Sequence, residues 1–351
     1  MKILSIGAFS KISNTSLHRT WALKKNASDV DMIDSDAPKI SLWYRICYHL
    51  FLWGLPIRLP DESHVNEKIR NYVSSKTYDV IWIDKGVTVA PETLKFIKEK
   101  NPETRIVSYS PDNMALRHNQ SQQFLECIPL YDIHFTTKSY ILDDMKHLGA
   151  QKIVFTNQLY ESTYHHPMTL TVDEKERLGE DVGFIGMWEK ERCDSILYLA
   201  KNGIKVKVFG GGKWNDYKNI PNLTICPAVY SADYSKALQA FKISLCFLRK
   251  MNFDQQTSRT MEIPGCGGFM MAEKTSEHLA LFEEGKEAVF FSSNEELLEK
   301  CRYYLSHDDE RIAIAEAGHK RCEASGYSNL MGIKKMLDVV FDSYKYGKNR
   351  I

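Results

Sequence analysis

The feature that most constrains the fold is an alternation of short apolar runs with amphipathic helical patterns, which occurs twice along the chain. In the first half, runs such as KILSIGAF and DVIWID are separated by helical patterns such as APETLKFIKEKNP. The second half restarts with DVGFIGMW, a helical pattern and IKVKVFGGG. Strands that alternate with helices form parallel sheets with helices on both faces. The sequence therefore predicts an α/β protein with two Rossmann-like, doubly wound domains that face each other across a cleft.

The alternation fades between Tyr160 and Glu180, in a polar stretch that includes TVDEKERLGE. At 351 residues the chain also exceeds the usual size of a single hydrophobic core. We therefore expect one domain over residues 1–165 and a second over residues 166–330. The last segment, residues 331–351, has a helical pattern, and we expect it to cross back and pack on the first domain.

Charge and cysteine content limit the partners and the compartment. The 46 basic and 45 acidic residues nearly cancel, so the whole chain has no electrostatic attraction for nucleic acid. Its eight cysteines form no Cys-X-X-Cys pair, which is typical of reduced thiols rather than of disulfides or a zinc site. The opening MKILSIGAFS resembles a buried strand and not a secretion signal. We expect a cytoplasmic protein, and the sequence leaves its oligomeric state open.

The most apolar stretch is ISLWYRICYHLFLWGLPIRLP, residues 40–60. Arg45 and His49 interrupt it, so it lacks the run of about 18 uncharged apolar residues that a membrane-spanning helix needs. Two interpretations stay open. The stretch is either a partly buried helix that covers the sheet, or a peripheral contact with the inner face of a membrane or with an apolar acceptor. Trp43 and Trp53 favour the second interpretation.

Polar residues follow two of the strand patterns in the first half. Asp84 ends YDVIWID, and Asp112 and Asn113 follow RIVSYSP. In open parallel sheets, ligands bind beyond the carboxyl ends of the strands. We therefore expect these three side chains to face one cleft.

A second group of polar residues lies in RTMEIPGCGGFMMAE, residues 259–273. Arg259 and Glu262 stand inside an apolar, helix-like run that stops at a glycine cluster. Burial of an ionised side chain is unfavourable unless the group has a partner or a ligand. The stretch therefore marks a candidate binding site.

These stretches resemble a known family. RTMEIPGCGGFMMAE with the following GKEAVFF, and the earlier FIGMWEKERCDSILYLAKNGIKVKVFGGG, are similar to the second domain of GT-B glycosyltransferases, above all the spore-maturation (CgeB-like) group. YDVIWIDKG, SPDN and FTTKSY resemble the first domain of that group more loosely. The resemblance implies the GT-B fold, with an acceptor site in the first domain and a nucleotide-sugar donor site in the second.

The resemblance assigns Glu262 to the ribose of the donor, because this residue occupies the position of the family's glutamate before the glycine turn. A carboxylate can accept hydrogen bonds from both ribose hydroxyls. Arg259 lies one helical turn earlier and suits a phosphate. Ser258 stands near the expected helix N-terminus, where N–H groups attract phosphate. The alternative is a capped core helix in which Arg259 and Glu262 form an ion pair.

Other residues complete the expected donor site. Asp254 stands eight residues before Glu262, where many sugar transferases of this fold carry a glutamate, so it is a candidate for the donor-sugar hydroxyls or for a helix cap. Arg192 is a second phosphate candidate. The glycines expected to turn the backbone or to leave room for the ligand are Gly186, Gly210, Gly265 and Gly267.

Sugar transfer requires charge to stabilise the leaving diphosphate, and we expect the two arginines to supply it without a metal ion. If the reaction inverts the anomeric carbon, a general base on the first domain is also required. Asp112 is the leading candidate, Asp84 the second and His118 the third. If the reaction retains configuration, no such base is needed. The adjacent histidines 165 and 166 are predicted to be exposed and not to bind metal.

The resemblance, together with the two Rossmann-like halves, therefore implies a hexosyltransferase-type enzyme. Its donor would be a nucleoside-diphosphate sugar, most simply a uridine diphosphate (UDP) sugar, and its acceptor a hydroxyl on a glycan, a lipid-linked molecule or a protein. Two alternatives stay open: a non-catalytic nucleotide-sugar-binding or assembly protein, and a sugar-nucleotide epimerase of the same architecture.

Overall fold

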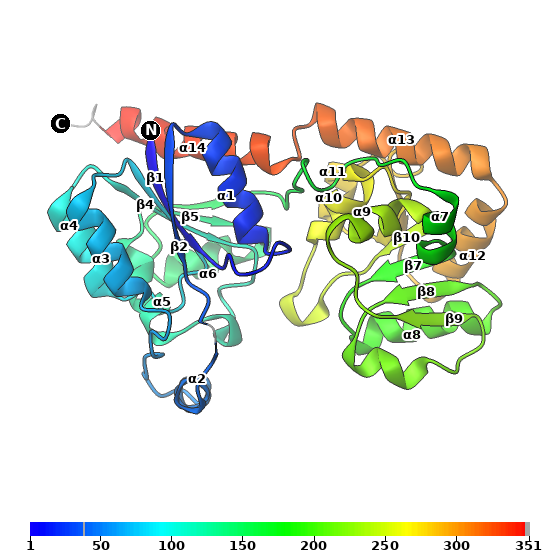
Figure 1. The fold of residues 1–351 in the computed structure, drawn as a ribbon, viewed down its shortest axis with the longest axis horizontal. Helices are drawn as coiled ribbons and strands as arrows, with labels where there is room; N and C mark the ends of the chain where they lie inside the picture. The colour runs from blue at the N-terminus through cyan, green and yellow to red at the C-terminus, as the bar shows by residue number, and fades with distance from the viewer. Residues whose placement is uncertain (38, 348–351) are drawn as a thin grey trace. The chain divides into compact units, whose positions relative to one another are not determined.

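The computed structural model describes residues 1–37 and 39–347, and the chain divides into two compact units. The amino-terminal unit comprises residues 1–157 together with the C-terminal segment from residue 329, and the carboxy-terminal unit comprises residues 158–328 (Figure 1). The junctions therefore fall at 157/158 and 328/329, where the sequence suggested 165/166 and 330/331.

The amino-terminal unit is a six-stranded parallel sheet in the order β2-β1-β3-β4-β5-β6. All five side chains of β3 are buried, which explains why residues 80–83 form an apolar run before Asp84. The strands are β1 Lys2–Gly7, β2 Asp29–Asp34, β3 Val80–Asp84, β4 Arg105–Ser110, β5 Ile133–Thr136 and β6 Ile153–Phe155. The helices are α1 Thr15–Asn26, α2 Leu42–Leu52, α3 Val65–Ser75, α4 Pro91–Lys100, α5 Gln122–Cys127, α6 Leu142–His147 and α14 Asn329–Gly347.

The C-terminal helix α14 belongs to the amino-terminal unit, as the sequence predicted. It packs beside α1 (Figure 1). The side-chain amide of Asn26, at the end of α1, donates a hydrogen bond of 3.0 Å to the carbonyl of Leu330. The chain therefore returns to its first unit after completing the second.

The carboxy-terminal unit repeats the architecture with a different strand order, β12-β11-β10-β7-β8-β9, again all parallel. Its strands are β7 Glu180–Ile185, β8 Val206–Phe209, β9 Leu223–Cys226, β10 Phe241–Cys246, β11 Met270–Glu273 and β12 Val289–Phe291. Its helices are α7 Val172–Leu178, α8 Lys190–Lys201, α9 Ser231–Ala240, α10 Ser258–Gly265, α11 Ser276–Leu281, α12 Asn294–Leu305 and α13 Asp308–Ala324.

The strand orders locate the points where a ligand can approach each sheet. In the amino-terminal unit the winding reverses between β1 and β3, and in the carboxy-terminal unit it reverses between β7 and β10. Helices that leave in opposite directions open a crevice at the carboxyl ends of such strand pairs. Both predicted groups of polar residues should therefore be sought at these two strand pairs.

A histidine buried in the first sheet makes the stability of that unit depend on pH. His134 lies on β5, and its Nε2 is 3.0 Å from the carbonyl of Ile128. Burial lowers the pKa of His134 to about 4. Below the unfolded-state pKa of about 6.5 the unfolded chain binds a proton that the folded chain excludes, so stability falls as the pH drops from 6.5 towards 4.

We expect this histidine alone to lower the free energy of unfolding by roughly 2 kcal/mol between pH 7 and pH 5. Urea unfolding at the two pH values, for the wild type and for His134→Gln, measures this difference. The exposed His147 on α6 provides the control, since His147→Gln should keep the wild-type pH dependence. An equal pH dependence in all three proteins would show that His134 is not the group responsible.

Candidate functional site

The helix α10 begins at the carboxyl end of β10. The backbone N–H of Thr257, which precedes the helix, donates to Oγ1 of Thr260 at 3.0 Å. Both threonine Oγ1 atoms lie 3.8 Å from the sulfur of Cys246, the last residue of β10. The N-terminus of α10, with Ser258 as its first residue, therefore opens at the reversal point between β7 and β10, as expected for a phosphate-binding helix.

Arg259, in the first turn of α10, reaches across to the end of β7. Its Nε donates to the carbonyl of Ile185 at 2.7 Å, and its guanidinium lies over the ring of Phe184. Gly186 makes this approach possible, because a Cβ there would lie 2.7 Å from Nη2 of Arg259. Among the described residues, none hydrogen-bonds to the two terminal nitrogens of this guanidinium. They are available to a ligand.

Arg192, on α8, joins the two strands at the reversal point. It donates to the carbonyl of Met187, just after β7, at 3.1 Å and to that of Leu248, just after β10, at 3.2 Å. Glu189 pairs with it at 3.1 Å. Burial lowers the pKa of Arg192, and the positive charges of Arg259 and Arg249 add to this effect although Glu189 opposes it. The guanidinium groups of Arg259 and Arg249 thus act on that of Arg192, and this accumulation of positive charge favours an anionic ligand.

Glu262, one turn after Arg259, is buried. Among the described residues it forms no ion pair with Arg259, although the core-helix alternative required one. Its Oε2 accepts a hydrogen bond from the hydroxyl of Tyr234 on α9. Its Oε1 lies 4.0 Å from Nε2 of His165. The carboxylate is therefore held by a phenol and approached by an imidazole, and within the described part of the chain no arginine or lysine forms an ion pair with it.

His165 corrects one expectation from the sequence, because it is 3% exposed and not a surface residue. Its Nδ1 accepts a hydrogen bond of 3.2 Å from the backbone N–H of Glu161. In the neutral ring the proton then sits on Nε2, which faces Glu262. Sequence reasoning missed both His165 and Tyr234. For Tyr234 a signal existed, since it lies four residues before Leu238 on the inward face of α9.

The remaining residues proposed for this site differ in what they do. Gly267 has φ +77°, so it supplies the turn that the sequence predicted after α10. Gly265 does not turn the chain; it is the last residue of α10, and a Cβ there would lie 2.9 Å from the ring of Tyr160. Gly210, after β8, makes room for Trp214, whose indole N–H donates to the carbonyl of Gly186 at 3.0 Å.

Asp254 is buried in the loop before α10. Its backbone N–H donates to the carbonyl of Arg249 at 3.2 Å, which ties the loop to one of the three arginines. This position near the arginines is compatible with either interpretation drawn from the sequence, a contact to the donor sugar or a structural cap.

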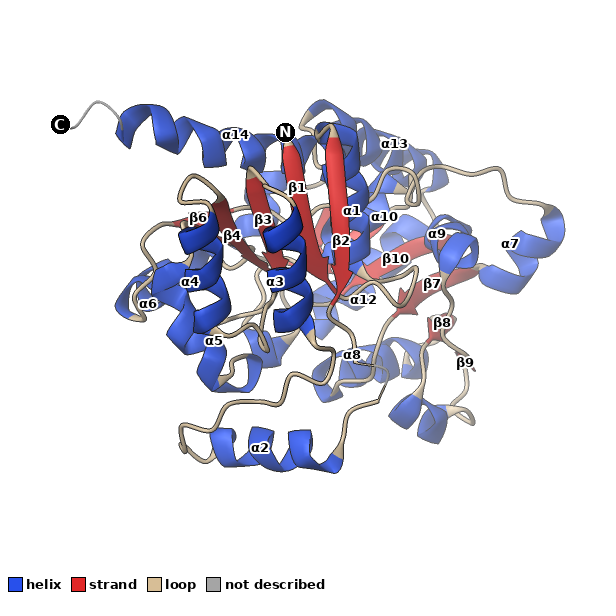
Figure 2. Ribbon diagram, turned by 60° about the vertical axis from the view of Figure 1, so that its left-hand side comes forward, coloured by secondary structure: helices blue, strands red, loops and turns tan. Residues whose placement is uncertain are grey.

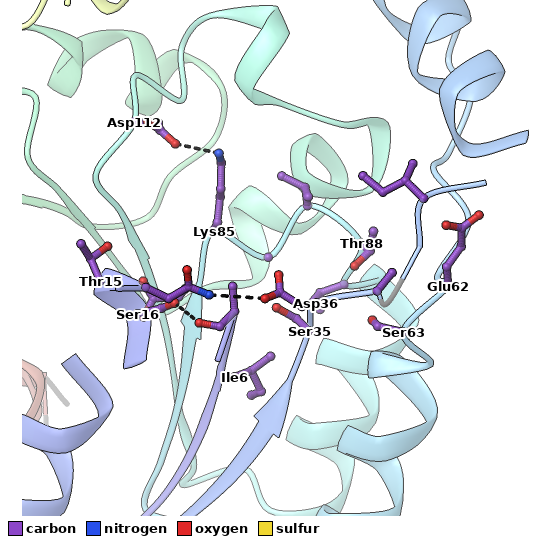
Figure 3. A pocket seen from close by; sticks show the side chains of 18 of the residues that line it. Ile6, Thr15, Ser16, Ser35, Asp36, Glu62, Ser63, Lys85, Thr88 and Asp112 are labelled. Carbon is purple, nitrogen blue, oxygen red and sulfur yellow. Dashed lines mark hydrogen bonds and ion pairs between the residues drawn. The ribbon is translucent and has the colours of Figure 1, made fainter. Parts of the chain in front are cut away.

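The amino-terminal unit has a cavity of about 430 Å³ at its own reversal point. Residues that follow β1, β2, β3 and β4 line it, so the carboxyl ends of four strands converge there (Figure 3). Asp112 reaches the cavity wall and pairs with Lys85 at 2.7 Å. Carboxylates and hydroxyls dominate the polar part of the lining, which includes Thr15, Ser16, Ser35, Asp36, Glu62, Ser63 and Thr88.

Asp84 also lines this cavity, but both of its oxygens are engaged. Oδ1 accepts from Nε and Nη2 of Arg19, the first at 3.0 Å, and Oδ2 accepts from the indole of Trp82 at 3.1 Å. Burial alone would lower the pKa of Arg19, but Asp84 raises it above the ordinary value. Arg19 also lies over the ring of Tyr109. Asp84 thus serves as the counter-ion of a buried arginine.

Two other residues expected at this edge lie elsewhere. Asn113 is buried in the turn after β4, where its side-chain oxygen accepts from the N–H of Ala115 at 3.0 Å, so it does not face the cavity as predicted. His118 is exposed in the single 3-10 turn Arg117–Asn119 and does not line the cavity.

Aspartates also occur in two Asp-X-Asp triplets of the first unit, a pattern that often holds divalent ions. Asp29 and Asp31 pair with Lys76 at 2.7 and 2.5 Å, and Asp36 accepts from Ser10 at 2.5 Å. Over residues 1–37 and 39–347 no cluster of three or more potential metal ligands is present. In the same residues, no helix has the length and apolarity needed to cross a membrane.

Comparison with known proteins adds a family match for part of the chain. Residues 192–336 match the family described as glycosyl transferase-like. The matched region includes Arg192, Arg259 and Glu262. No curated protein matches the sequence at a significant level.

Solved structures resemble the whole chain. Sucrose-phosphate synthase from Thermosynechococcus elongatus has a TM-score of 0.68 at 9% identity, covering 99% of this chain and 100% of the other. HepE of Anabaena, solved with UDP-glucose, has a TM-score of 0.62 at 12% identity, covering 98% and 100%. A protein assigned as a UDP-N-acetylglucosamine 2-epimerase from Listeria monocytogenes has a TM-score of 0.62 at 11% identity, covering 98% and 97%. The chain therefore has the GT-B fold.

Proposed function

We propose that the chain is a glycosyltransferase that moves a hexose from a UDP-sugar to a hydroxyl of a glycan, a lipid-linked molecule or a protein. The observation that carries the proposal is the arrangement at the reversal point between β7 and β10. There the buried carboxylate of Glu262, which Tyr234 holds by a hydrogen bond, and a group of arginines share one short helix and its surroundings. The family match over residues 192–336 and the UDP-glucose complex of the structural neighbour support a nucleotide-sugar donor.

On the donor side, each group has a distinct task. Glu262 accepts hydrogen bonds from the ribose hydroxyls, with Tyr234 and His165 holding its side chain in place. Arg259 and Arg192, together with the N-terminus of α10, stabilise the charge that grows on the diphosphate as the sugar leaves. Because guanidinium and N–H groups supply this charge, the proposed reaction requires no metal ion.

On the acceptor side, the cavity of the amino-terminal unit holds the hydroxyl substrate. Asp112 is the proposed general base, because it lines the cavity and its partly exposed carboxylate pairs with the exposed Lys85 at 2.7 Å. Asp84 is less suited to this role, since Arg19 and Trp82 occupy both of its oxygens. A retaining reaction would dispense with the base and leave the donor site unchanged.

The donor assignment is tested by thermal unfolding of the wild type with UDP, GDP, CMP and dTDP. A nucleotide present at about 100 times its dissociation constant should stabilise the fold by roughly 2.7 kcal/mol, which raises the melting temperature by several degrees. Glu262→Gln should lose most of this gain. Glu299→Gln, at an exposed position on α12, is the matched control and should keep it. The absence of a shift with every nucleotide would overturn the proposal.

The second candidate is a sugar-nucleotide epimerase, favoured by the structural likeness to the Listeria protein. An epimerase converts a free UDP-sugar to its epimer in the absence of any acceptor, whereas a transferase releases UDP. Chromatography of the nucleotide products separates these outcomes. A protein that binds UDP but yields neither product would be the non-catalytic binding protein that the sequence left open.

A further inference from the structure

The segment over residues 39–60 presents large apolar side chains to solvent. Trp53 is 80% exposed, Leu42 73% and Trp43 61%, and Ile46 and Leu55 are exposed as well. These five residues are called the α2 surface below. Nothing in the proposed donor or acceptor chemistry uses them.

The inner face of α2 explains how the helix is held while its outer face stays uncovered. Cys47 and Phe51 are buried. The Nε of Arg117 donates to the carbonyl of Phe51 at 2.7 Å, and its guanidinium lies 4.0 Å from the centre of the Phe51 ring. The hydroxyl of Tyr48 donates to the carbonyl of His118 at 2.8 Å. Figure 2 shows α2 standing away from the sheet of the amino-terminal unit.

Around the axis of α2, basic residues lie beside the exposed apolar ones. At 100° per residue, Leu42, Ile46 and Trp53 fall within a sector of roughly 40° on the outer face. The exposed Arg45 and His49 flank this sector on one side, and Trp43 lies on the other. The exposed Lys39 precedes the helix, and no acidic residue occurs from residue 39 to residue 60.

We propose that the α2 surface docks on the headgroup region of an anionic lipid bilayer. Apolar side chains insert at the boundary between headgroups and acyl chains, tryptophan rings prefer that depth, and cations pair with anionic headgroups. A second copy of the chain fits less well, because a two-fold contact through this surface would bring together two copies of a segment that carries Lys39 and Arg45 and no acidic residue. The inference does not depend on the proposed glycosyl transfer.

The test is flotation of the full chain with two kinds of vesicle, one of phosphatidylcholine alone and one containing phosphatidylglycerol. We expect binding to the phosphatidylglycerol vesicles, with a blue shift of tryptophan fluorescence. Replacement of both exposed tryptophans, Trp43→Ser with Trp53→Ser, should lower the partition coefficient by about ten-fold or more. Arg45→Ala or added salt should weaken binding to the anionic vesicles.

The matched control removes apolar surface of similar exposure from the other unit, Val172→Ser with Ile312→Ser, and should bind as the wild type does. Equal loss of binding in the control and in the tryptophan variant would overturn the proposal, as would a wild type that fails to float with either vesicle. Sedimentation velocity adds a separate outcome. A concentration-dependent dimer that the tryptophan variant loses, without any flotation, would assign the surface to a second copy of the chain.

Discussion

Replacement of Asp112 by Asn is expected to reduce turnover by roughly a thousand-fold, because removal of a general base usually lowers a rate by a factor of about 100 to 10,000. The fold should survive. The ion pair with Lys85 joins partly exposed groups, and such pairs contribute less than about 1 kcal/mol. The affinity for UDP should not change, since no donor contact is removed. The measurement is the rate of UDP release from UDP-glucose, with a panel of monosaccharides or water as the acceptor.

Two control variants make this result interpretable. Asp36→Asn alters another carboxylate of the same cavity and should change turnover by less than about ten-fold, because Asp36 has no proposed role as a base. Asp84→Asn should instead destabilise the protein by about 3–5 kcal/mol, since it leaves the buried Arg19 without its counter-ion. If Asp112→Asn releases UDP at the wild-type rate, the reaction needs no base at this position and a retaining mechanism is favoured.

The fold was largely predictable because its signal is local. The run VIWI, residues 80–83, is apolar because both faces of a parallel sheet are covered, and helical patterns separate such runs along the chain. The position of α10 was predictable for a similar reason, as the run before Gly267 has a helical pattern and the glycine has the positive φ that ends it. The alternation also predicted that Asp84 and Asp112 would face one cavity, whereas the same prediction for Asn113 was wrong.

The partners of these residues were not predictable, because they depend on contacts between segments that are distant in sequence. Arg19 is 65 residues from Asp84, and nothing in either local pattern indicates that the pair is buried. His165 stands in a polar stretch, yet the rings of Tyr164 and Tyr234 cover it. The sequence predicted that Gly265 is part of a glycine turn. In the structure the ring of Tyr160 packs against Gly265 and leaves no room for a side chain there. Propensity and spacing carry no information on such packing.

The role proposed for Arg259 predicts a loss of affinity that is specific for the diphosphate. Arg259→Ala should weaken UDP binding by roughly 10- to 100-fold, because each charge-assisted hydrogen bond contributes about 1.5–3 kcal/mol. Uridine lacks phosphate, so its affinity should change by less than about three-fold. Glu262→Gln should weaken UDP and uridine by similar factors, since the ribose is common to both. Isothermal titration of UDP and uridine against the wild type and both variants measures these changes in affinity.

The controls for this comparison lie in the same unit. Arg302→Ala removes an exposed arginine of α12, whose guanidinium donates to the carbonyl of Asn202 at 3.2 Å, and should leave both affinities unchanged. Arg259→Lys keeps a positive charge but loses the planar fork that reaches Ile185 and a phosphate together, so an intermediate UDP affinity is expected. Equal losses for UDP and uridine in Arg259→Ala would mean that the guanidinium orders the end of β7 rather than contacting phosphate. In that case Arg192 and the N-terminus of α10 would bind the diphosphate without Arg259.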